Sequence, residues 1–598
     1  MTIVTDRSGA HAPQPYASFD QGLSNVAPKS VRHSRLKRFA RRIFSEGGLV
    51  TVLTFALYLV VGVLLDFHYL SFNGDAFSRM ANGFYVLYSR DPHLAAIGFV
   101  WNPGTSIADL VPLLLYHLWT PFASHMFAAS LVSAASMAGA VYQVRCTLAE
   151  WGVSRAPRLV LVAVLALNAM IVYYGGNGMS EGLYLFTLVA SCRYLLRWLR
   201  DDDLRSMTYA AVALGACYLV RSEAVAPAIF AGVVVVGVSF SRKSSTRLLR
   251  TSTPRSVRVW GALTDLAIFE FPFVTTFLGW AAVSYVITGS PFEQFTSIYG
   301  NASQERLLSH LALHARIATD VRDVNYLAPT IVIVLVVAIY LAARRRDVGL
   351  LAPLAVVGGG LAFDLLSYAA NTIQPFFRYF ITAVPLEVLL VGSLFATAPA
   401  LIGSERSRTA SKGAARRRVM GAVAVVVALA LLLPAAVTTV RGMGNSKVGI
   451  EEVEFLGFIF HKHPSAADEE ARSQYAAMLT ITNYLVGKRL ADGQVVVDNF
   501  SGCIPMIIAM SPNPDIFVIP NDRDFQRVLD DPLTFHAHYI LDADPSGAGG
   551  LTAPNITFPT LWQRGGGFST DLHTFPASGL CAEFKLFKVT GHPNQATG

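Results

Sequence analysis

The stretch Gly48–Asp66, GLVTVLTFALYLVVGVLLD, decides the fold class of this chain. It carries no charge before its last residue, and its length is close to the ~20 residues that cross a bilayer core as a helix. Ten further apolar runs follow it. Of the 598 residues, 53% are hydrophobic and only 15% are charged, whereas soluble proteins average about 25% charged residues. The sequence therefore predicts an α-helical polytopic membrane protein.

Hydropathy and charge together predict how the chain crosses the membrane. One short apolar stretch, 107–119, contains Asp109, Pro112 and His117, which suits an interfacial helix better than a crossing. With that choice every basic cluster falls in a cytoplasmic loop. The prediction is a multi-pass protein of the plasma membrane with its N-terminus in the cytoplasm and its C-terminus outside. The eleven predicted spans are 48–66, 126–144, 158–174, 181–198, 206–221, 224–240, 264–287, 328–343, 348–367, 379–400 and 419–440.

Composition also divides the chain into three parts. Residues 1–45 are predicted to be a disordered, basic, cytoplasmic N-terminus, and residues 46–440 the transmembrane domain. In 441–598 the long apolar runs cease and short β-rich runs alternate with helical ones, which predicts an extracytoplasmic α/β domain. Cys503 and Cys581 both fall there, so a disulfide and a pair of buried free thiols both stay open.

The net charge of +8 raises the question of nucleic acid. The basic residues, however, stand in short clusters between apolar runs, an example being RRR at 344–346. Such clusters mark cytoplasmic loops of membrane proteins. The expected partners are therefore lipid headgroups, and no nucleic acid is expected.

Unusual polar residues gather in four segments that the topology places outside. Taken singly, each residue fits a purely structural role: a solvated loop residue, an ion pair at a helix break, or an arginine that reaches toward headgroups. Together they predict one cavity open to the outer face, because charges at membrane depth usually face a cavity or one another. The segments are FNGDAFSRMANGFYVLYSRDPHLAAIGFVWNPG (72–104), YYGGNGMSEGLY (173–184), YLVRSEAVAP (218–227) and SYAANTIQPFFRYF (367–380).

In order and on one side, these motifs resemble those of the GT-C glycosyltransferases, polytopic enzymes that use polyprenyl-phosphate sugars. The likeness is to the mycobacterial arabinofuranosyltransferase type and to the protein-mannosyltransferase-like group. Those families often have DDAF, VWNPG, LET and RPEG. This chain has GDAF, VWNPG, SEG and RSEA, followed by RYFITAVP at 378–385. The resemblance covers about 48–400 and implies a GT-C type membrane domain.

The resemblance implies a membrane glycosyltransferase of cell-envelope biogenesis. Its donor would be a polyprenyl-phosphate sugar, with arabinose or mannose favoured, and its acceptor an extracytoplasmic glycan, lipid or protein. Because a lipid phosphate leaves without help from an acid, one carboxylate suffices as the base for an inverting displacement. Asp75 is the expected base.

The remaining expected site residues bind substrate. Arg378, and after it Arg221, would hold the phosphate through their fork-shaped guanidinium groups. Glu181 and Glu223 would hold sugar hydroxyls or orient the arginines. No metal ligands are predicted, and a role for a divalent cation is left open. The other substrate-binding candidates are Trp101, Asn102, Tyr379 and His93.

Two other classes of function compete with this one. An outward-facing polar cavity also suits a transporter or flippase of a lipid-linked sugar, although transporters often show internal repeats and helices broken at the midplane, and the sequence shows neither. The second is a non-catalytic membrane protein that binds envelope glycan. That class leaves the ordered acid and arginine motifs unexplained.

Overall fold

The computed structural model describes residues 45–243, 254–297, 311–397, 414–460, 465–500, 502–579 and 581–593. The described residues from Val50 onward form one compact unit, and Ser45–Leu49 are assigned to a separate one. The predicted disordered N-terminus, 1–45, lies outside the described residues apart from Ser45. The predicted boundary at 440/441 falls inside the larger unit and stays a prediction.

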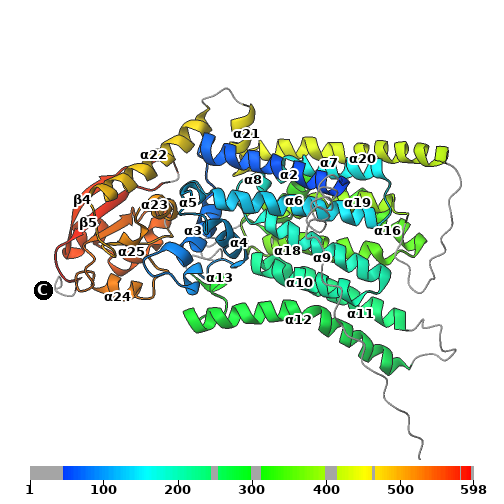
Figure 1. Cartoon of the computed structure of the whole chain (residues 1–598), viewed down its shortest axis with the longest axis horizontal. Coiled ribbons are helices and arrows are strands. Elements are labelled where there is room, and N and C mark those ends of the chain that lie inside the picture. The colour runs from blue at the N-terminus through cyan, green and yellow to red at the C-terminus, as the bar shows by residue number, and fades with distance from the viewer. Residues whose placement is uncertain are drawn as a thin grey trace, which may run out of the picture. The chain divides into compact units, whose positions relative to one another are not determined.

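Long helices form most of the chain before residue 444, and many of them run side by side (Figure 1). Their apolar sequences leave the backbone groups no partner in lipid except one another, which only a helix or a closed barrel satisfies. The helices are α2 (Glu46–Val63), α3 (Gly74–Tyr88), α4 (Gly104–Leu113), α5 (Pro121–Ser124), α6 (Phe127–Glu150), α7 (Arg155–Ala166), α8 (Ala169–Gly176), α9 (Glu181–Asp201), α10 (Leu204–Val220), α11 (Val225–Lys243), α12 (Arg255–Thr288), α13 (Glu293–Thr296), α15 (Leu313–Leu327), α16 (Ile331–Arg345), α17 (Leu351–Ala355), α18 (Val357–Ala369), α19 (Ala383–Leu394) and α20 (Ala414–Met443).

The chain is a multi-pass membrane protein. Among the described residues, seven helices are long and apolar enough to span a membrane, or up to nine if each bent pair counts as one span. The bent pairs are α7 with α8, at 60°, and α15 with α16, at 77°. The first bend falls inside the predicted span 158–174, where Asn168 caps α8 by accepting a hydrogen bond from the Met170 amide (3.1 Å). All eleven predicted spans contain helix, and their exact number stays a prediction.

Glycines bring two pairs of elements into close contact. A Cβ at Gly62 of α2 would lie 2.9 Å from the carbonyl oxygen of Gly176 in α8, and one at Gly104 would lie 2.7 Å from the carbonyl oxygen of Leu219. Small residues let helix backbones approach in this way in membrane proteins. The second contact places the start of α4 against the end of α10, directly before Arg221.

The predicted external segment 67–125 is mostly helical rather than an extended loop. α2 continues as a π-helical turn over Leu64–Tyr69, and α3 then begins where the Asn73 side chain accepts a hydrogen bond from the Asp75 amide. The stretch predicted to be interfacial contains α4, which has Pro112 near its end, and a turn that leads to α5. This segment therefore provides a rigid support for Asp75.

The C-terminal region contains a small mixed sheet, seen at the left of Figure 1. Its strand order is β2-β1-β3-β5-β4, with β1 parallel to both β2 and β3, and β5 antiparallel to β3 and β4. The strands are β1 (Val495–Val497), β2 (Phe517–Val518), β3 (Tyr539–Ala543), β4 (Ser569–Phe575) and β5 (Phe584–Val589). The helices of this region are α21 (Glu452–Phe460), α22 (Ala466–Gly487), α23 (Ile504–Met510), α24 (Phe525–Asp530), α25 (Ala553–Thr557) and α26 (Leu561–Arg564). This confirms the predicted fold class of a helical membrane protein with a C-terminal α/β region.

The two faces of the sheet are buried in different cores. Val496 and Ile540 pack with α24 residues such as Val528 in a core of their own. Their strand neighbours Val495 and Leu541 belong instead to the large core that also contains the membrane helices. Because successive strand residues point to opposite faces, the sheet joins its own helices on one side and the helical part of the molecule on the other.

Covalent and ionic contacts fix this region further. Cys503 and Cys581 are joined in a disulfide, with a Cα–Cα distance of 5.4 Å, so the pairing that the sequence left open is present. At the end of α3, Arg90 contacts Asp522 at 3.1 Å and also pairs with Asp524. Arg523 donates to Asp91 at 2.9 Å. These pairs connect α3 directly to the segment after β2.

A buried acid makes the stability of this region depend on pH. Asp542 in β3 is 2% exposed, and burial raises its pKa to about 7. A carboxyl group whose pKa is raised on folding stabilises the fold below its unfolded pKa, and that contribution is lost as pH rises through the folded value, at about 1.4 kcal/mol per pH unit. We expect the melting temperature to fall as pH rises from about 5 to about 7 and to level off above that, and Asp542→Asn to flatten this fall. Thermal unfolding measured by intrinsic fluorescence at several pH values tests this, with Asp571→Asn, at an exposed acid of β4, as the control. An equally steep profile in Asp542→Asn would contradict it.

Candidate functional site

Asp75 lies at the first turn of α3, where a negative charge is favoured by the helix dipole. Its side chain is 29% exposed and faces cavities inside the molecule. Two cations approach one of its oxygens: Nη2 of Arg378 donates to Oδ2 at 2.7 Å, and Nη1 of Arg79 lies 3.9 Å from the same atom. Among the described residues no hydrogen bond reaches Oδ1, so this oxygen remains available to a substrate.

Arg378 is the centre of the charge cluster. It lies in the 3₁₀-helical turn Phe377–Thr382, between α18 and α19, and its side chain is 3% exposed. Besides Asp75 it pairs with Glu451, and its Nε lies 3.6 Å from Oε1 of Glu181. A buried guanidinium that reaches three carboxylates fixes their positions relative to one another.

Arg221 forms a second, linked cluster at the end of α10. Its Nη1 donates to Oε1 of Glu181 at 2.6 Å and its Nε to Oε1 of Glu223 at 2.7 Å. Glu181, 1% exposed at the start of α9, therefore lies between Arg221 and Arg378. The Tyr379 ring is shared in the same way, with its centroid 5.2 Å from Arg221 Cζ and 5.5 Å from Arg378 Cζ.

The VWNPG motif serves two different purposes. Trp101 lies under the Arg79 guanidinium, 4.2 Å from Cζ to the ring centroid, and its Nε1 donates to the Ser78 hydroxyl at 3.4 Å. Asn102 is buried, and its amide donates to the Tyr218 carbonyl near the end of α10. In this structure Asn102 therefore holds the loop against α10, whereas Trp101 faces open space.

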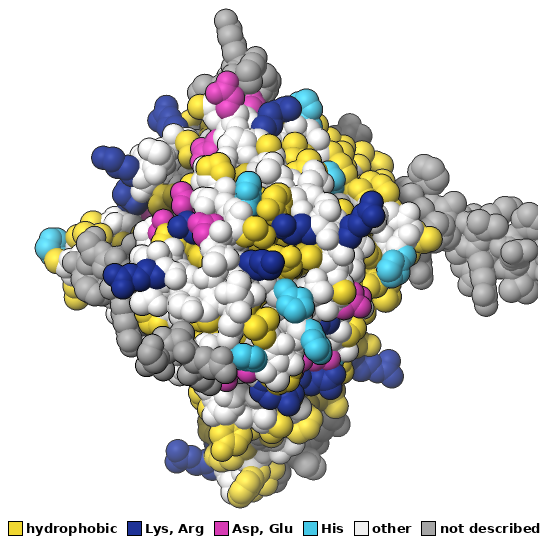
Figure 2. All heavy atoms as spheres, turned by 90° about the vertical axis from the view of Figure 1, so that its left-hand side faces the viewer, with side chains coloured by type: hydrophobic (Ala, Val, Ile, Leu, Met, Phe, Trp, Pro, Cys, Tyr) yellow, Lys and Arg dark blue, Asp and Glu magenta, His cyan; other side chains and the backbone are white. Residues whose placement is uncertain are grey.

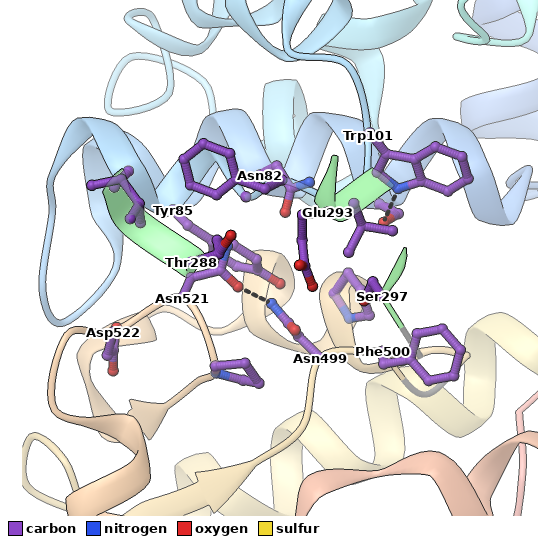
Figure 3. A pocket seen from close by; sticks show the side chains of 18 of the residues that line it. Asn82, Tyr85, Trp101, Thr288, Glu293, Ser297, Asn499, Phe500, Asn521 and Asp522 are labelled. Carbon is purple, nitrogen blue, oxygen red and sulfur yellow. Dashed lines mark hydrogen bonds between the residues drawn. The ribbon is translucent and has the colours of Figure 1, made fainter. Parts of the chain in front are cut away.

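Two cavities meet at Asp75. The smaller, about 320 Å³, is lined by all three arginines of the cluster and by apolar side chains such as Phe295 and Phe363. The larger, about 810 Å³, extends from α3 to the C-terminal region (Figure 3). Asp75 and Trp101 line both cavities. The carboxylate is thus accessible from two sides.

The electrostatic surroundings keep Asp75 charged. Burial alone would raise its pKa, but Arg378, Arg79 and Arg221 together lower it below the ordinary aspartate value. Glu451 shows the opposite balance, because burial raises its pKa even though Arg378 opposes this. Asp75 is therefore ionised throughout the physiological pH range and can accept a proton.

The structure brings together eight of the nine residues singled out from the sequence. Asp75, Trp101, Asn102, Glu181, Arg221, Glu223, Arg378 and Tyr379 line the smaller cavity or bond directly to residues that do. His93 lines only the larger cavity, with its Nδ1 2.6 Å from the Asp91 carbonyl oxygen.

Three residues of the cluster escaped sequence reasoning. Arg79 could have been found, because it follows Asp75 by one helical turn in a stretch with a helical pattern. Glu451 had no such signal, since it stands in an acidic run beyond the last span and reaches Arg378 only in the folded chain. Asp364, which falls in the predicted span 348–367, lines the smaller cavity.

No group of three or more His, Cys, Asp or Glu side chains placed to hold a metal ion occurs in the described part of the chain. The carboxylates of the cluster are engaged by arginines instead.

The chain matches no known family model and no curated protein sequence. It does resemble solved structures. ArnT from Cupriavidus metallidurans bound to undecaprenyl phosphate aligns with a TM-score of 0.51 at 13% identity, covering 91% of this chain and 99% of ArnT. The oligosaccharyltransferase AglB from Archaeoglobus fulgidus, in complex with an inhibitory peptide and a dolichol-phosphate, aligns with a TM-score of 0.41 at 10% identity, covering 83% and 69%. The likeness to ArnT shows that this chain shares the fold of ArnT.

Proposed function

We propose that this protein is a membrane glycosyltransferase that moves a sugar from a polyprenyl-phosphate donor to an acceptor of the cell envelope. The observation that carries the proposal is the position of Asp75. It is the one carboxylate in the wall of both cavities among the described residues, and its Oδ1 is open while its Oδ2 is held by Arg378. A base that must meet two substrates needs this placement.

The smaller cavity suits the donor. Arg79, Arg221 and Arg378 bring three guanidinium groups to its wall, the kind of group that binds phosphate well. Apolar side chains such as Phe363 and Ile373 line the same cavity and suit a prenyl chain. The undecaprenyl phosphate bound to ArnT supports the same type of ligand here.

The proposed reaction is a single displacement. An acceptor hydroxyl oxygen attacks the anomeric carbon while the bond from that carbon to the phosphate oxygen breaks, which inverts the centre. The hydroxyl proton passes to Oδ1 of Asp75, and the polyprenyl phosphate leaves with its negative charge held by the arginines. Glu181 and Glu223 keep Arg221 in place. An ionised Asp75 is ready for this step.

The donor sugar is tested with the purified chain in lipid nanodiscs. We expect either polyprenyl-phosphate-arabinose or polyprenyl-phosphate-mannose to be consumed, with release of polyprenyl phosphate detected by mass spectrometry. Asp75→Asn should slow this release by about 10²–10⁴-fold. Donor that binds equally well to both forms without turnover would contradict the proposal and would favour a transporter or a glycan-binding role.

A further inference from the structure

Amide side chains gather at one end of the larger cavity. Asn82 belongs to α3, Asn499 follows β1 and Asn521 follows β2, and all three line the cavity (Figure 3). β1 and β2 are parallel neighbours. Their carboxyl ends therefore place the side-chain amides of Asn499 and Asn521 at the same edge of the sheet. Ligands of open α/β sheets commonly bind at such an edge.

Hydrogen bonds hold part of this amide group in place and leave the rest open. Asn521 donates to the Ala96 carbonyl and accepts from Nδ2 of Asn499, both at 2.6 Å. Gly98, at φ +73°, lies between Asn82 of α3 and Asn521, which follows β2. A Cβ at Gly98 would come 3.5 Å from Nδ2 of both side chains. A side chain at Gly98 would thus contact both amides.

The aromatic and charged side chains that line the larger cavity indicate which class of ligand it binds. Trp101, Phe99 and Phe500 offer ring surface to the same cavity, and such rings commonly cover the apolar face of a sugar. The charged side chains that line the cavity are three carboxylates, Asp75, Glu293 and Asp522, and one arginine, Arg523. Arg523 already pairs with Asp91. Asp75 and Asp522 are likewise paired, with Arg378 and Arg90. An anionic ligand would therefore meet no unpaired cation among the described lining residues, and would be repelled by Glu293.

The distribution of charge on the surface also argues against an anionic ligand. On the face shown in Figure 2, basic, acidic and histidine side chains are interspersed rather than gathered by sign. No basic patch on that face would guide a polyanion toward the cavity.

We propose that the larger cavity is the acceptor site and that its ligand is an uncharged, hydroxyl-rich carbohydrate. Amides both donate to and accept from hydroxyl groups, and the cavity volume of about 810 Å³ falls in the range of sites for ligands of drug size. This inference rests on the proposed function, since it places an acceptor hydroxyl beside Asp75. It assigns recognition of the acceptor to residues of both α3 and the C-terminal region.

The test measures binding by isothermal titration in nanodiscs. The probes are neutral octyl disaccharides of arabinose and of mannose, a phosphorylated octyl mannoside, and an uncharged peptide. We expect at least one neutral glycoside to bind, and Asn499→Leu and Asn82→Leu each to weaken that binding at least about tenfold, because a site built for hydrogen bonds is left with unpaired groups. Asn513→Leu, at an exposed asparagine outside the cavity, is the matched control.

The outcomes separate this inference from the proposed function. Failure of both neutral glycosides to bind at about 10 mM, or preferential binding of the phosphorylated probe or the peptide, overturns the inference even if donor turnover is intact. Amide-dependent binding of a neutral glycoside without turnover of either donor would support a carbohydrate site in the larger cavity, but would overturn the proposed function and with it the assignment of this ligand as an acceptor. Because Asn82 and Asn499 lie in different parts of the chain, misfolding of one variant leaves the other informative.

Discussion

Replacement of Asp75 by asparagine is expected to reduce sugar transfer by about 10²–10⁴-fold, the range typical for loss of a general base. Asparagine is similar in size and its oxygen can still accept from Arg378, so the site should keep its shape. It cannot take a proton from an acceptor hydroxyl. Donor affinity should therefore change much less than turnover, because the phosphate is held by the arginines and not by Asp75.

Initial rates of polyprenyl phosphate release, together with donor dissociation constants, measure the two effects separately. Asp530→Asn, at an exposed acid of α24, controls for a general loss of charge. If Asp75→Asn weakens donor binding as much as it slows transfer, Asp75 is an electrostatic support for the donor rather than the base.

Removal of the Arg378 side chain is expected to have the largest effect on stability. Arg378→Ala would leave Asp75, Glu181 and Glu451 without their shared cation in a buried site. Breaking a buried ion pair in this way typically costs about 3–5 kcal/mol. Arg378→Lys keeps the charge, but a single ammonium cannot reach three carboxylates as the planar guanidinium does. Arg378→Lys should therefore restore folding in part, but it should restore hardly any sugar transfer.

Thermal unfolding in nanodiscs and donor titration distinguish the two contributions of Arg378. Arg527→Ala, at an exposed arginine of α24, is the matched control and should change neither. Full transfer activity in Arg378→Lys would show that only the charge of this residue matters, and would contradict the fork-shaped phosphate contact.

The sequence was sufficient for the fold class because its strongest signal is also the strongest constraint. An apolar run as long and as continuous as 48–66 is typical of a membrane-spanning helix, and the alternating runs after 441 indicated an α/β region. The bends at Asn168 and between α15 and α16 were not predicted, since hydropathy averages over a window and does not register a local cap. Nor could spacing show whether Cys503 and Cys581 pair, because the pairing depends on how α23 approaches the segment before β5.

The site was predictable where motifs carry it and not elsewhere. Acids and arginines in four outer segments indicated a shared cavity, and the structure brings them together. Glu451 was missed because its role depends on a contact with Arg378 that no local pattern encodes. Asn102 was expected near the sugar, but its amide is engaged by the Tyr218 carbonyl. A motif thus predicts reliably that a residue has a role, and less reliably which role it has.

Asp75 and Trp101 line both cavities, and this has a consequence for how the two cavities can vary independently. The arginine-lined cavity is built from the membrane helices and the segments between them, whereas the other cavity takes much of its lining from the segments after β1 and β2. Under the proposed assignment of the two cavities, substitutions in those C-terminal segments would alter the choice of acceptor and leave the lipid carrier unchanged. Mutation could then change the acceptor while the lipid-linked donor stays the same, or the reverse.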